Sequence, residues 1–252
     1  MKRIAFWMAS GKNFIDEARN SSNELKAVMP ELERALFTPD PVKPKEFDRV
    51  AMLPERTPMH WFADRLRYFP TIVDLLEDYN ECLYLDSDTN FIYSFWEIFD
   101  TLKRFDIAVP MGARRVTGDT LHDLPDSFAE YELGVIVFKR NDRVRNLFMT
   151  WDRLHRTHPH LYGNNSQRSF RDAVWECDDL MIDRLPSEYG LRWSFGEFMS
   201  LKVKILHGRY YEHPLSPTIE DVKKIVNSHD GMRIWSPRDP HWNEGTILRR
   251  HD

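Results

Sequence analysis

The feature that most constrains this chain is a short apolar run that ends in two aspartates. Leu83, Tyr84 and Leu85 form the run, which is typical of a buried central strand. Asp86 and Asp88 follow it, and two carboxylates so placed repel each other unless a cation lies between them. A hard divalent ion such as Mg²⁺ or Mn²⁺ fits this need, because it binds carboxylate oxygens and leaves sites open for phosphate. The alternative is that Asp86 only caps a turn.

The composition indicates a folded protein and argues against a nucleic-acid partner. The 252 residues are 42% hydrophobic and 30% charged, so we expect one large domain with a sizeable core. The formal net charge of −5 has the wrong sign for a protein whose affinity depends on a basic face. We therefore expect no nucleic acid among the partners.

Cysteine usage and hydropathy predict the compartment. Cys82 and Cys177 are the only cysteines, and Cys82 opens the expected central strand, so a reducing compartment fits better than a disulfide framework. No apolar run approaches the length of a membrane span, and the N-terminal apolar stretch is too short for a signal peptide. The sequence thus predicts a cytoplasmic protein without a membrane span.

Strand and helix patterns alternate along the chain. Strands are expected at residues 3–9, 35–38, 47–52, 83–85, 107–110, 133–138 and 202–206. Helices are expected at residues 14–28, 62–76, 94–104, 144–154, 166–175 and 216–226. Pro70 should kink or divide the second helix, and Ser216 with Pro217 should begin the last one.

This alternation predicts an α/β fold with a mostly parallel sheet flanked by helices, as a single domain over residues 1–252. From about residue 228 the chain shows no periodicity, so an irregular C-terminal tail is expected. Residues 111–131 form a polar, turn-rich loop, which we expect to cover a ligand as a lid. Gly134, near the start of an apolar run, predicts a bulge or a close approach of ligand or backbone.

Several segments, in their order and spacing, together resemble a nucleotide-diphospho-sugar transferase of the GT-A fold. They are the first strand, residues 83–91 (LYLDSDTNF), residues 133–138 (LGVIVF), Ser166-Gln167, Leu185-Pro186 with Tyr189, and residues 205–208 (ILHG). The likeness spans roughly residues 2 to 210 and in plan is closest to glycogenin- and galactosyltransferase-like retaining enzymes. It implies a GT-A-like (Rossmann-like) sheet and a glycosyltransferase that moves a hexose, with retention, from a UDP-linked donor to a hydroxyl acceptor. The acceptor class, whether glycan, protein or small molecule, is left open.

The resemblance also implies roles for individual residues. Asp86, Asp88 and His207 are expected to bind Mn²⁺ or Mg²⁺. The residues expected to contact the nucleotide-sugar are Ala9, Ser10, Lys12, Arg65, Asp86, Ser87, Gly134, Gly208 and Arg209.

Catalytic roles are expected for Asp88, Gln167 and Asp179. Transfer passes through an oxocarbenium-like transition state, which a carboxylate can stabilise or assist as a base. Asp178, Asp179 and Glu132 are the candidates, and the sequence does not choose among them. The first two also fit a solvated helix end.

The chain departs from the family pattern at three places. Glu132 stands where an Asn is common, and Ser166 stands where an Asp usually precedes the Gln. The family's HxxGxxKPW is absent, because Gly208 and Arg209 follow His207 directly; Arg209 is a candidate to replace the lysine that clamps diphosphate.

Two other interpretations remain open. A phosphohydrolase of the haloacid-dehalogenase type also uses a strand followed by D-x-D, but it would place the aspartates near the N-terminus and a Thr two residues after the second one. Here Thr89 is adjacent to Asp88. The altered motifs also permit a catalytically silent protein of the same fold that only binds nucleotide-sugar.

Overall fold

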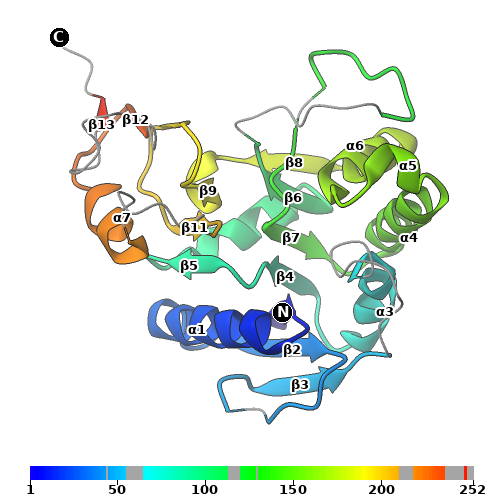
Figure 1. Ribbon diagram of the computed structural model, residues 1–252, viewed down its shortest axis with the longest axis horizontal. Helices are drawn as coiled ribbons and strands as arrows, with labels where there is room; N and C mark the ends of the chain where they lie inside the picture. Colours follow the sequence, from blue (N-terminus) through cyan, green and yellow to red (C-terminus); the bar gives the residue numbers. More distant parts are fainter. Residues whose placement is uncertain are drawn as a thin grey trace.

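A computed structural model describes residues 1–43, 45–54, 65–112, 120–128, 130–209, 218–235 and 247–248. Its centre is a seven-stranded sheet in the order β3-β2-β1-β4-β7-β6-β8, with helices on both faces (Figure 1). Neighbouring strands are parallel except where β7 pairs with β4 and with β6. The predicted α/β fold, with a mostly parallel sheet flanked by helices in one domain, is confirmed.

The strands of this sheet follow the expected order along the chain. They are β1 (Arg3–Met8), β2 (Glu33–Thr38), β3 (Arg49–Met52), β4 (Glu81–Leu85), β6 (Ile107–Pro110), β7 (Val135–Lys139) and β8 (Ile182–Leu185). The strand that precedes the two aspartates, β4, occupies the middle of the seven and is buried throughout. Its central position was predicted from its unbroken apolar run.

The helices divide between the two faces of the sheet. They are α1 (Lys12–Val28), η1 (Arg65–Arg67), α3 (Tyr68–Leu75), η2 (Trp96–Lys103), α4 (Asp142–Thr157), α5 (Pro159–Tyr162), α6 (Ser166–Glu176), η3 (Ser187–Tyr189) and α7 (Ile219–Ile225). Successive side chains of a strand point to opposite faces. In β1, Phe6 therefore joins the core formed with α3, α4 and α6, whereas Trp7 joins the core formed with α1 and η2.

Two small sheets complete the described chain. β5 (Thr89–Phe91), β11 (Ile205–His207) and β9 (Leu191–Arg192) form one, in the order β5-β11-β9. β10 (Glu197–Met199), β12 (Arg233–Trp235) and β13 (Ile247–Leu248) form the other. The first of these sheets joins the segment that follows β4 to strands that lie about a hundred or more positions later in the sequence.

Two short strands, β12 and β13, lie in the segment from about residue 228 onward, which the sequence predicts to be an irregular tail. The indole of Trp235 is fully buried and donates a hydrogen bond to the carbonyl oxygen of Trp193 at 2.6 Å. Strands of two or three residues are too short to show a period of two, so the sequence pattern could not reveal them.

Several boundaries also differ from those expected. The segment at 94–104 is a 3₁₀ helix over Trp96–Lys103, and α7 begins at Ile219. Thr218 caps α7 in a capping box with Asp221, which replaces the expected cap; Ser216 and Pro217 lie outside the described residues. Pro70 is the third residue of α3, within its first turn, and the 3₁₀ turn η1 runs directly into this helix, so the helix is not divided at Pro70 itself.

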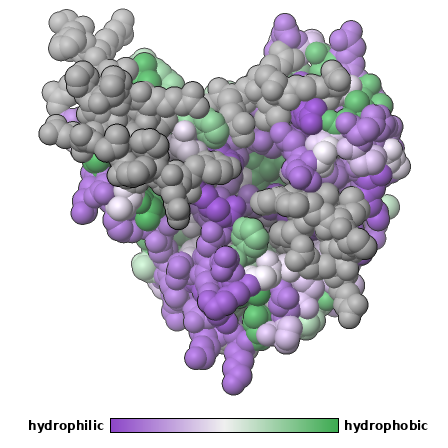
Figure 2. Space-filling model, viewed as in Figure 1, coloured by the Kyte–Doolittle hydropathy of each residue, from purple (hydrophilic) through white to green (hydrophobic). Residues whose placement is uncertain are grey.

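Because the apolar side chains pack on the two faces of the sheet, the outer surface is mostly polar. Figure 2 shows the described surface on one face of the molecule, where hydrophilic residues predominate and hydrophobic ones form small separate patches. Among the residues that the structure describes, no helix has both the length and the apolar character needed to cross a bilayer.

Candidate metal centre

Asp86 and Asp88 lie in a tight turn directly after the carboxyl end of the central strand β4. Leu85, the last residue of β4, pairs with the first residue of the antiparallel strand β7. The backbone N–H of Asp86 donates to the carbonyl oxygen of Gly134 at 2.8 Å, just before β7 begins. The hydroxyl of Thr89 donates to the carbonyl oxygen of Asp86 at 2.8 Å and closes the turn. The end of β4 and the start of β7 thus form one fixed platform.

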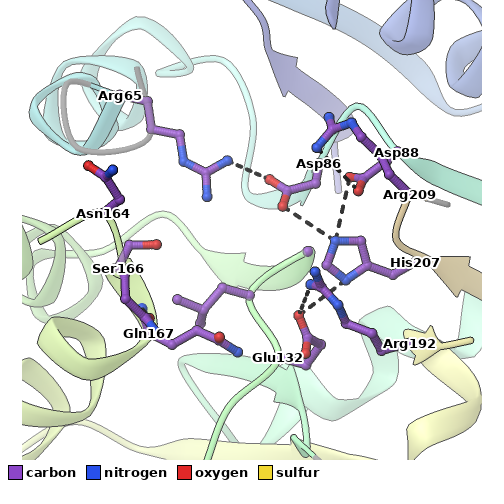
Figure 3. A pocket seen from close by; sticks show the side chains of 13 residues that line it. Arg65, Asp86, Asp88, Glu132, Asn164, Ser166, Gln167, Arg192, His207 and Arg209 are labelled. Atoms are coloured by element: carbon purple, nitrogen blue, oxygen red, sulfur yellow. Dashed lines mark hydrogen bonds and ion pairs between the residues drawn. The ribbon is translucent and has the colours of Figure 1, made fainter. Parts of the chain in front are cut away.

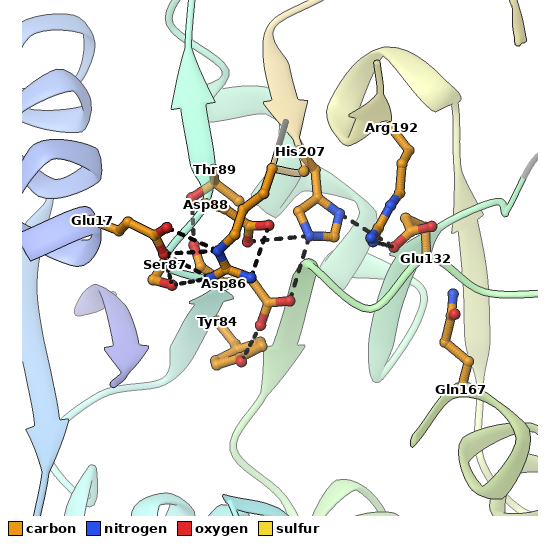
Figure 4. A network of polar contacts seen from close by, with 12 residues as sticks. Glu17, Tyr84, Asp86, Ser87, Asp88, Thr89, Glu132, Gln167, Arg192 and His207 are labelled. Atoms are coloured by element: carbon orange, nitrogen blue, oxygen red, sulfur yellow. Dashed lines mark hydrogen bonds and ion pairs between the residues drawn. The ribbon is translucent and has the colours of Figure 1, made fainter. Parts of the chain in front are cut away.

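His207 reaches this platform from the far end of the chain. β11 pairs antiparallel with β5, and the register places His207 opposite Thr89. Its Nε2 lies 3.4 Å from Oδ2 of Asp86 and 3.5 Å from Oδ1 of Asp88 (Figure 4). One ligand atom from each of the three residues lies within 4.8 Å of the others. The structure brings together the three side chains expected to bind metal.

Gly134 makes room for the imidazole. A Cβ atom at this position would lie 2.2 Å from Cε1 of His207, so any other residue would collide with the ring. Gly134 lies in the turn before β7 and not inside the strand, but the expected close approach is present. The approaching group is a side chain of the protein itself. After the histidine, Gly208 has a φ of +120°, a conformation that favours glycine and turns the chain toward Arg209.

The remaining carboxylate oxygens are held by fixed groups. Oδ1 of Asp86 accepts from Nη1 of Arg65 at 2.7 Å and from the hydroxyl of Tyr84. Oδ2 of Asp88 lies 3.5 Å from Nη1 of Arg209. The oxygens that face one another and the histidine are therefore the other two. This donor set, two carboxylates and one imidazole, suits Mn²⁺ or Mg²⁺.

The pKa shifts follow from this crowding of charges. Burial alone would raise the pKa of Asp86, but the charges of Arg65 and His207 hold it well below its usual range. Burial also works against ionisation of Asp88, and His207 lowers the pKa of that carboxyl as well. Burial would lower the pKa of His207, yet the aspartates raise it well above its ordinary value. In the metal-free protein, the imidazole is therefore protonated at neutral pH and balances the two aspartates.

A cleft opens beside the three side chains. Figure 3 shows Arg65, Asn164, Ser166 and Gln167 on one side of it and the aspartates, His207, Glu132 and Arg192 on the other. The residues that line it are Arg65, Asp86, Asp88, Glu132, Leu133, Gly134, Asn164, Asn165, Ser166, Gln167, Arg192, His207 and Arg209. Three arginines beside a carboxylate pair form a site in which anionic oxygens and a divalent cation can bind together.

Most of the residues singled out in the sequence meet at this cleft. Arg65, Gly134, Gln167 and Arg209 line it together with the expected metal ligands. Ser87 lies behind it, where its hydroxyl donates to Glu17 and accepts from Arg209, each at 2.9 Å. Gly208 follows the histidine.

Ala9 and Ser10 follow the carboxyl end of β1, which pairs with β4, but they do not line the cleft. The hydroxyl of Ser10 is buried and has no hydrogen-bond partner among the described residues.

Two expected positions do not fit. Asp179 is exposed in the turn between α6 and β8. β8 runs parallel to β6, so its carboxyl end points to the cleft, and Asp179, which precedes β8, lies at the opposite end of the strand. Its neighbour Asp178 lies there as well. Lys12, the first residue of α1, has a side chain that is 87% exposed and paired with Asp16, and it does not line the cleft. The loop at 111–131 falls partly outside the described residues, at 113–119 and 129.

Other residues of the site were missed. Arg192 comes from a strand of two residues, which has no sequence signal. Asn164 and Asn165 precede α6, and Asn165 caps it by accepting from the N–H of Gln167; an Asn before an expected helix is a signal that could have found it. Glu17, which holds Arg209 through three hydrogen bonds at 2.7, 2.9 and 3.1 Å, lies on the polar side of an amphipathic helix and gave no signal.

Comparisons with known proteins add no further identification. No family model matches the chain, and a search of curated proteins finds no match.

Proposed function

We propose that this protein is a metal-dependent glycosyltransferase of the GT-A type, which moves a hexose from a nucleotide-diphosphate donor, UDP-linked, to a hydroxyl acceptor. The observation that carries the proposal is the convergence of Asp86, Asp88 and His207 at the carboxyl edge of the central strand, beside a cleft lined by arginines. In open α/β sheets, ligands bind in the crevice outside the carboxyl ends of the strands. The order of motifs along the chain supports the same assignment.

The reaction breaks the bond between the anomeric carbon and the β-phosphate oxygen, so negative charge develops on the leaving diphosphate. A divalent ion held by Asp86, Asp88 and His207 would supply the positive charge that stabilises it. Arg209, fixed by Glu17, lies beside the same carboxylates and can bind a phosphate oxygen.

On the other side of the cleft, Gln167 is oriented by a backbone contact. Its Nε2 donates to the carbonyl oxygen of Tyr131 at 2.8 Å. The amide oxygen is then left to accept a hydrogen bond from a sugar hydroxyl. Gln167 thus positions the sugar in this proposal.

The state of the carboxylates supports retention of the anomeric configuration. Those that line the cleft are Asp86, Asp88 and Glu132, and each contacts an arginine and His207. Within the described part of the cleft no carboxylate is free to act as a base on the opposite face of the sugar. In the proposed reaction, the departing phosphate accepts the proton of the acceptor hydroxyl on the same face.

Asp86 is poorly placed for the haloacid-dehalogenase alternative. That chemistry needs a carboxylate oxygen that can attack phosphorus. Here Oδ1 of Asp86 is held by Arg65 and Tyr84, and Oδ2 faces His207. The alternative of a protein that binds nucleotide-sugar without turnover is separated from the proposal by assay alone.

The test is incubation with UDP-hexoses, Mn²⁺ and a panel of glycan acceptors, followed by assignment of the product anomer by NMR. We expect a product with the anomeric configuration of the donor and loss of activity in Asp88→Asn. Asp179→Asn is the matched control, because this carboxylate lies at the end of β8 away from the cleft, and it should retain activity. Binding of donor with neither transfer nor slow donor hydrolysis would favour the silent protein, and an inverted product would exclude the retaining route.

A further inference from the structure

Glu132 contacts the imidazole of His207 on the side away from the aspartates. Its Oε1 lies 3.2 Å from Nδ1 of His207, while Nε2 of the same ring faces Asp86 and Asp88 (Figure 4). The glutamate is 5% exposed. The imidazole is therefore enclosed between carboxylates on both of its nitrogens.

The position of Glu132 is fixed from two directions. Its backbone N–H donates to the carbonyl oxygen of Pro110 at the end of β6, at 2.9 Å. Its Oε1 also accepts from Nη1 of Arg192 at 2.8 Å. Two residues further on, Gly134 lies against the face of the histidine ring. The segment 132–134 thus controls both the plane and the far nitrogen of the imidazole.

We propose that Glu132 is a positioning residue for the metal centre, which acts through His207. A carboxylate beside Nδ1 favours the tautomer that carries its proton on that nitrogen, which leaves the lone pair of Nε2 free for a cation. Arg192 holds the carboxylate in place and balances its charge. The inference rests on the proposed function only in taking His207 as a metal ligand.

The experiment measures Mn²⁺ affinity directly, by calorimetry and by electron paramagnetic resonance of free Mn²⁺, in the full chain. Outer carboxylates of this kind contribute about 10- to 100-fold to metal affinity. We expect Glu132→Gln to weaken Mn²⁺ binding by about tenfold and Glu132→Ala by up to about 100-fold. Glu130→Gln is the matched control, since Glu130 forms a buried ion pair with Arg171 at 2.9 Å in the same segment but does not contact His207.

A second measurement separates positioning from general loosening. In a His207→Ala background, the added Glu132→Gln change should leave the residual Mn²⁺ affinity unchanged, because the glutamate no longer has a ligand to orient. The Nδ1 resonance of His207 in ¹⁵N NMR should also shift in Glu132→Gln and not in Glu130→Gln. If Glu132→Ala does not fold, the Gln variant carries the test.

The outcomes distinguish this inference from the proposed function. Equal Mn²⁺ affinity in the wild type and Glu132→Gln, or an equal loss in Glu130→Gln, would overturn the positioning role while leaving the transferase proposal in place. Weaker Mn²⁺ binding in Glu132→Gln without transfer from any nucleotide-sugar would leave the positioning role standing and remove the proposed reaction.

Discussion

Aspartates lie at both ends of the central strands, and their surroundings differ: Asp106 is buried, whereas Asp86 and Asp88 are partly exposed. Asp106 precedes β6 at one end and accepts from Asn141 at 2.8 Å, from Arg143 at 2.8 Å and from the N–H of Met181 at 3.1 Å. At the other end, Asp86 and Asp88 each have one oxygen that faces Nε2 of His207, at 3.4 and 3.5 Å.

The difference separates a structural carboxylate from a functional one. The donors around Asp106 come from the segments on either side of β6, so its charge fastens β6, β8 and the start of α4 together. The carboxylates of Asp86 and Asp88 instead both face His207, and their negative charges are neutralised by a proton on that residue or by a bound cation. Buried charges are tolerated when they are paired, and here the pairing at one end is exchangeable.

The largest expected effect on activity comes from removing the charge of one of the two paired aspartates, Asp86 and Asp88. Asp88→Asn should lower kcat/KM of nucleotide-sugar transfer by more than about 100-fold, because the metal loses one of its two carboxylate ligands and is bound more weakly. Its free energy of unfolding without metal should change only modestly, because loss of the attraction to protonated His207 is offset by loss of the repulsion from Asp86. A large loss of stability in urea unfolding would mean that Asp88 is structural like Asp106, and the comparison would fail.

A pH titration tests whether the proton and the cation compete. Because the pKa of His207 is raised well above its ordinary value, a metal must displace a proton at neutral pH. Mn²⁺ affinity should therefore rise by about tenfold per pH unit between pH 6 and 8. Calorimetry in buffers of different ionisation enthalpy should give about one proton released per ion bound. No proton release would contradict the proposed exchange.

A substitution at Gly134 sharpens the geometric side of the comparison. In Gly134→Ala the new methyl would meet the ring of His207 at 2.2 Å, so the imidazole must move. We expect weaker Mn²⁺ binding and a loss of about 1–3 kcal/mol in unfolding free energy. Gly196→Ala is the control, because its Cβ would meet its nearest neighbour, the carbonyl oxygen of Trp235, at an ordinary 3.5 Å.

The smallest effect is expected at the other end of the strands, at Asp106. Asp106→Asn should destabilise the fold by about 1–3 kcal/mol and leave Mn²⁺ affinity unchanged. Burial acts to raise the pKa of Asp106, but Arg143 and the N–H of Met181 lower it overall. A carboxyl with a lowered pKa in the fold stabilises above its unfolded pKa of about 4 and loses this contribution as the pH falls below it. The gap between wild type and variant should therefore shrink from pH 7 to pH 3 in denaturant titrations.

The sheet and the aspartate pair could be predicted because they depend on local pattern. The apolar run before Asp86 indicated a buried strand, and alternation of strands with helices indicated its parallel neighbours. Asp179 lies away from the cleft because it precedes β8 instead of following it, and the sequence pattern does not tell at which end of a strand a carboxylate emerges. Arg192 could not be found, since its placement depends on the pairing of a two-residue strand with β11.

The expected ligand His207 depended on resemblance, and its chemistry depends on contacts that no local pattern contains. Glu132 and Gly134 belong to the turn before β7, and only the fold brings them to the ring of His207.

The pairing of β11 with β5 has a consequence for how the site is assembled. Asp86 and Asp88 are in place once the central sheet has formed, but His207 arrives only when a much later segment docks beside them. A bound ion would therefore link Asp86 and Asp88 to His207 and stabilise the docking of the later segment. Hydrogen exchange at Leu206 and His207 should slow on addition of Mn²⁺ by more than exchange within β1, so that occupancy of the site reports completion of the fold.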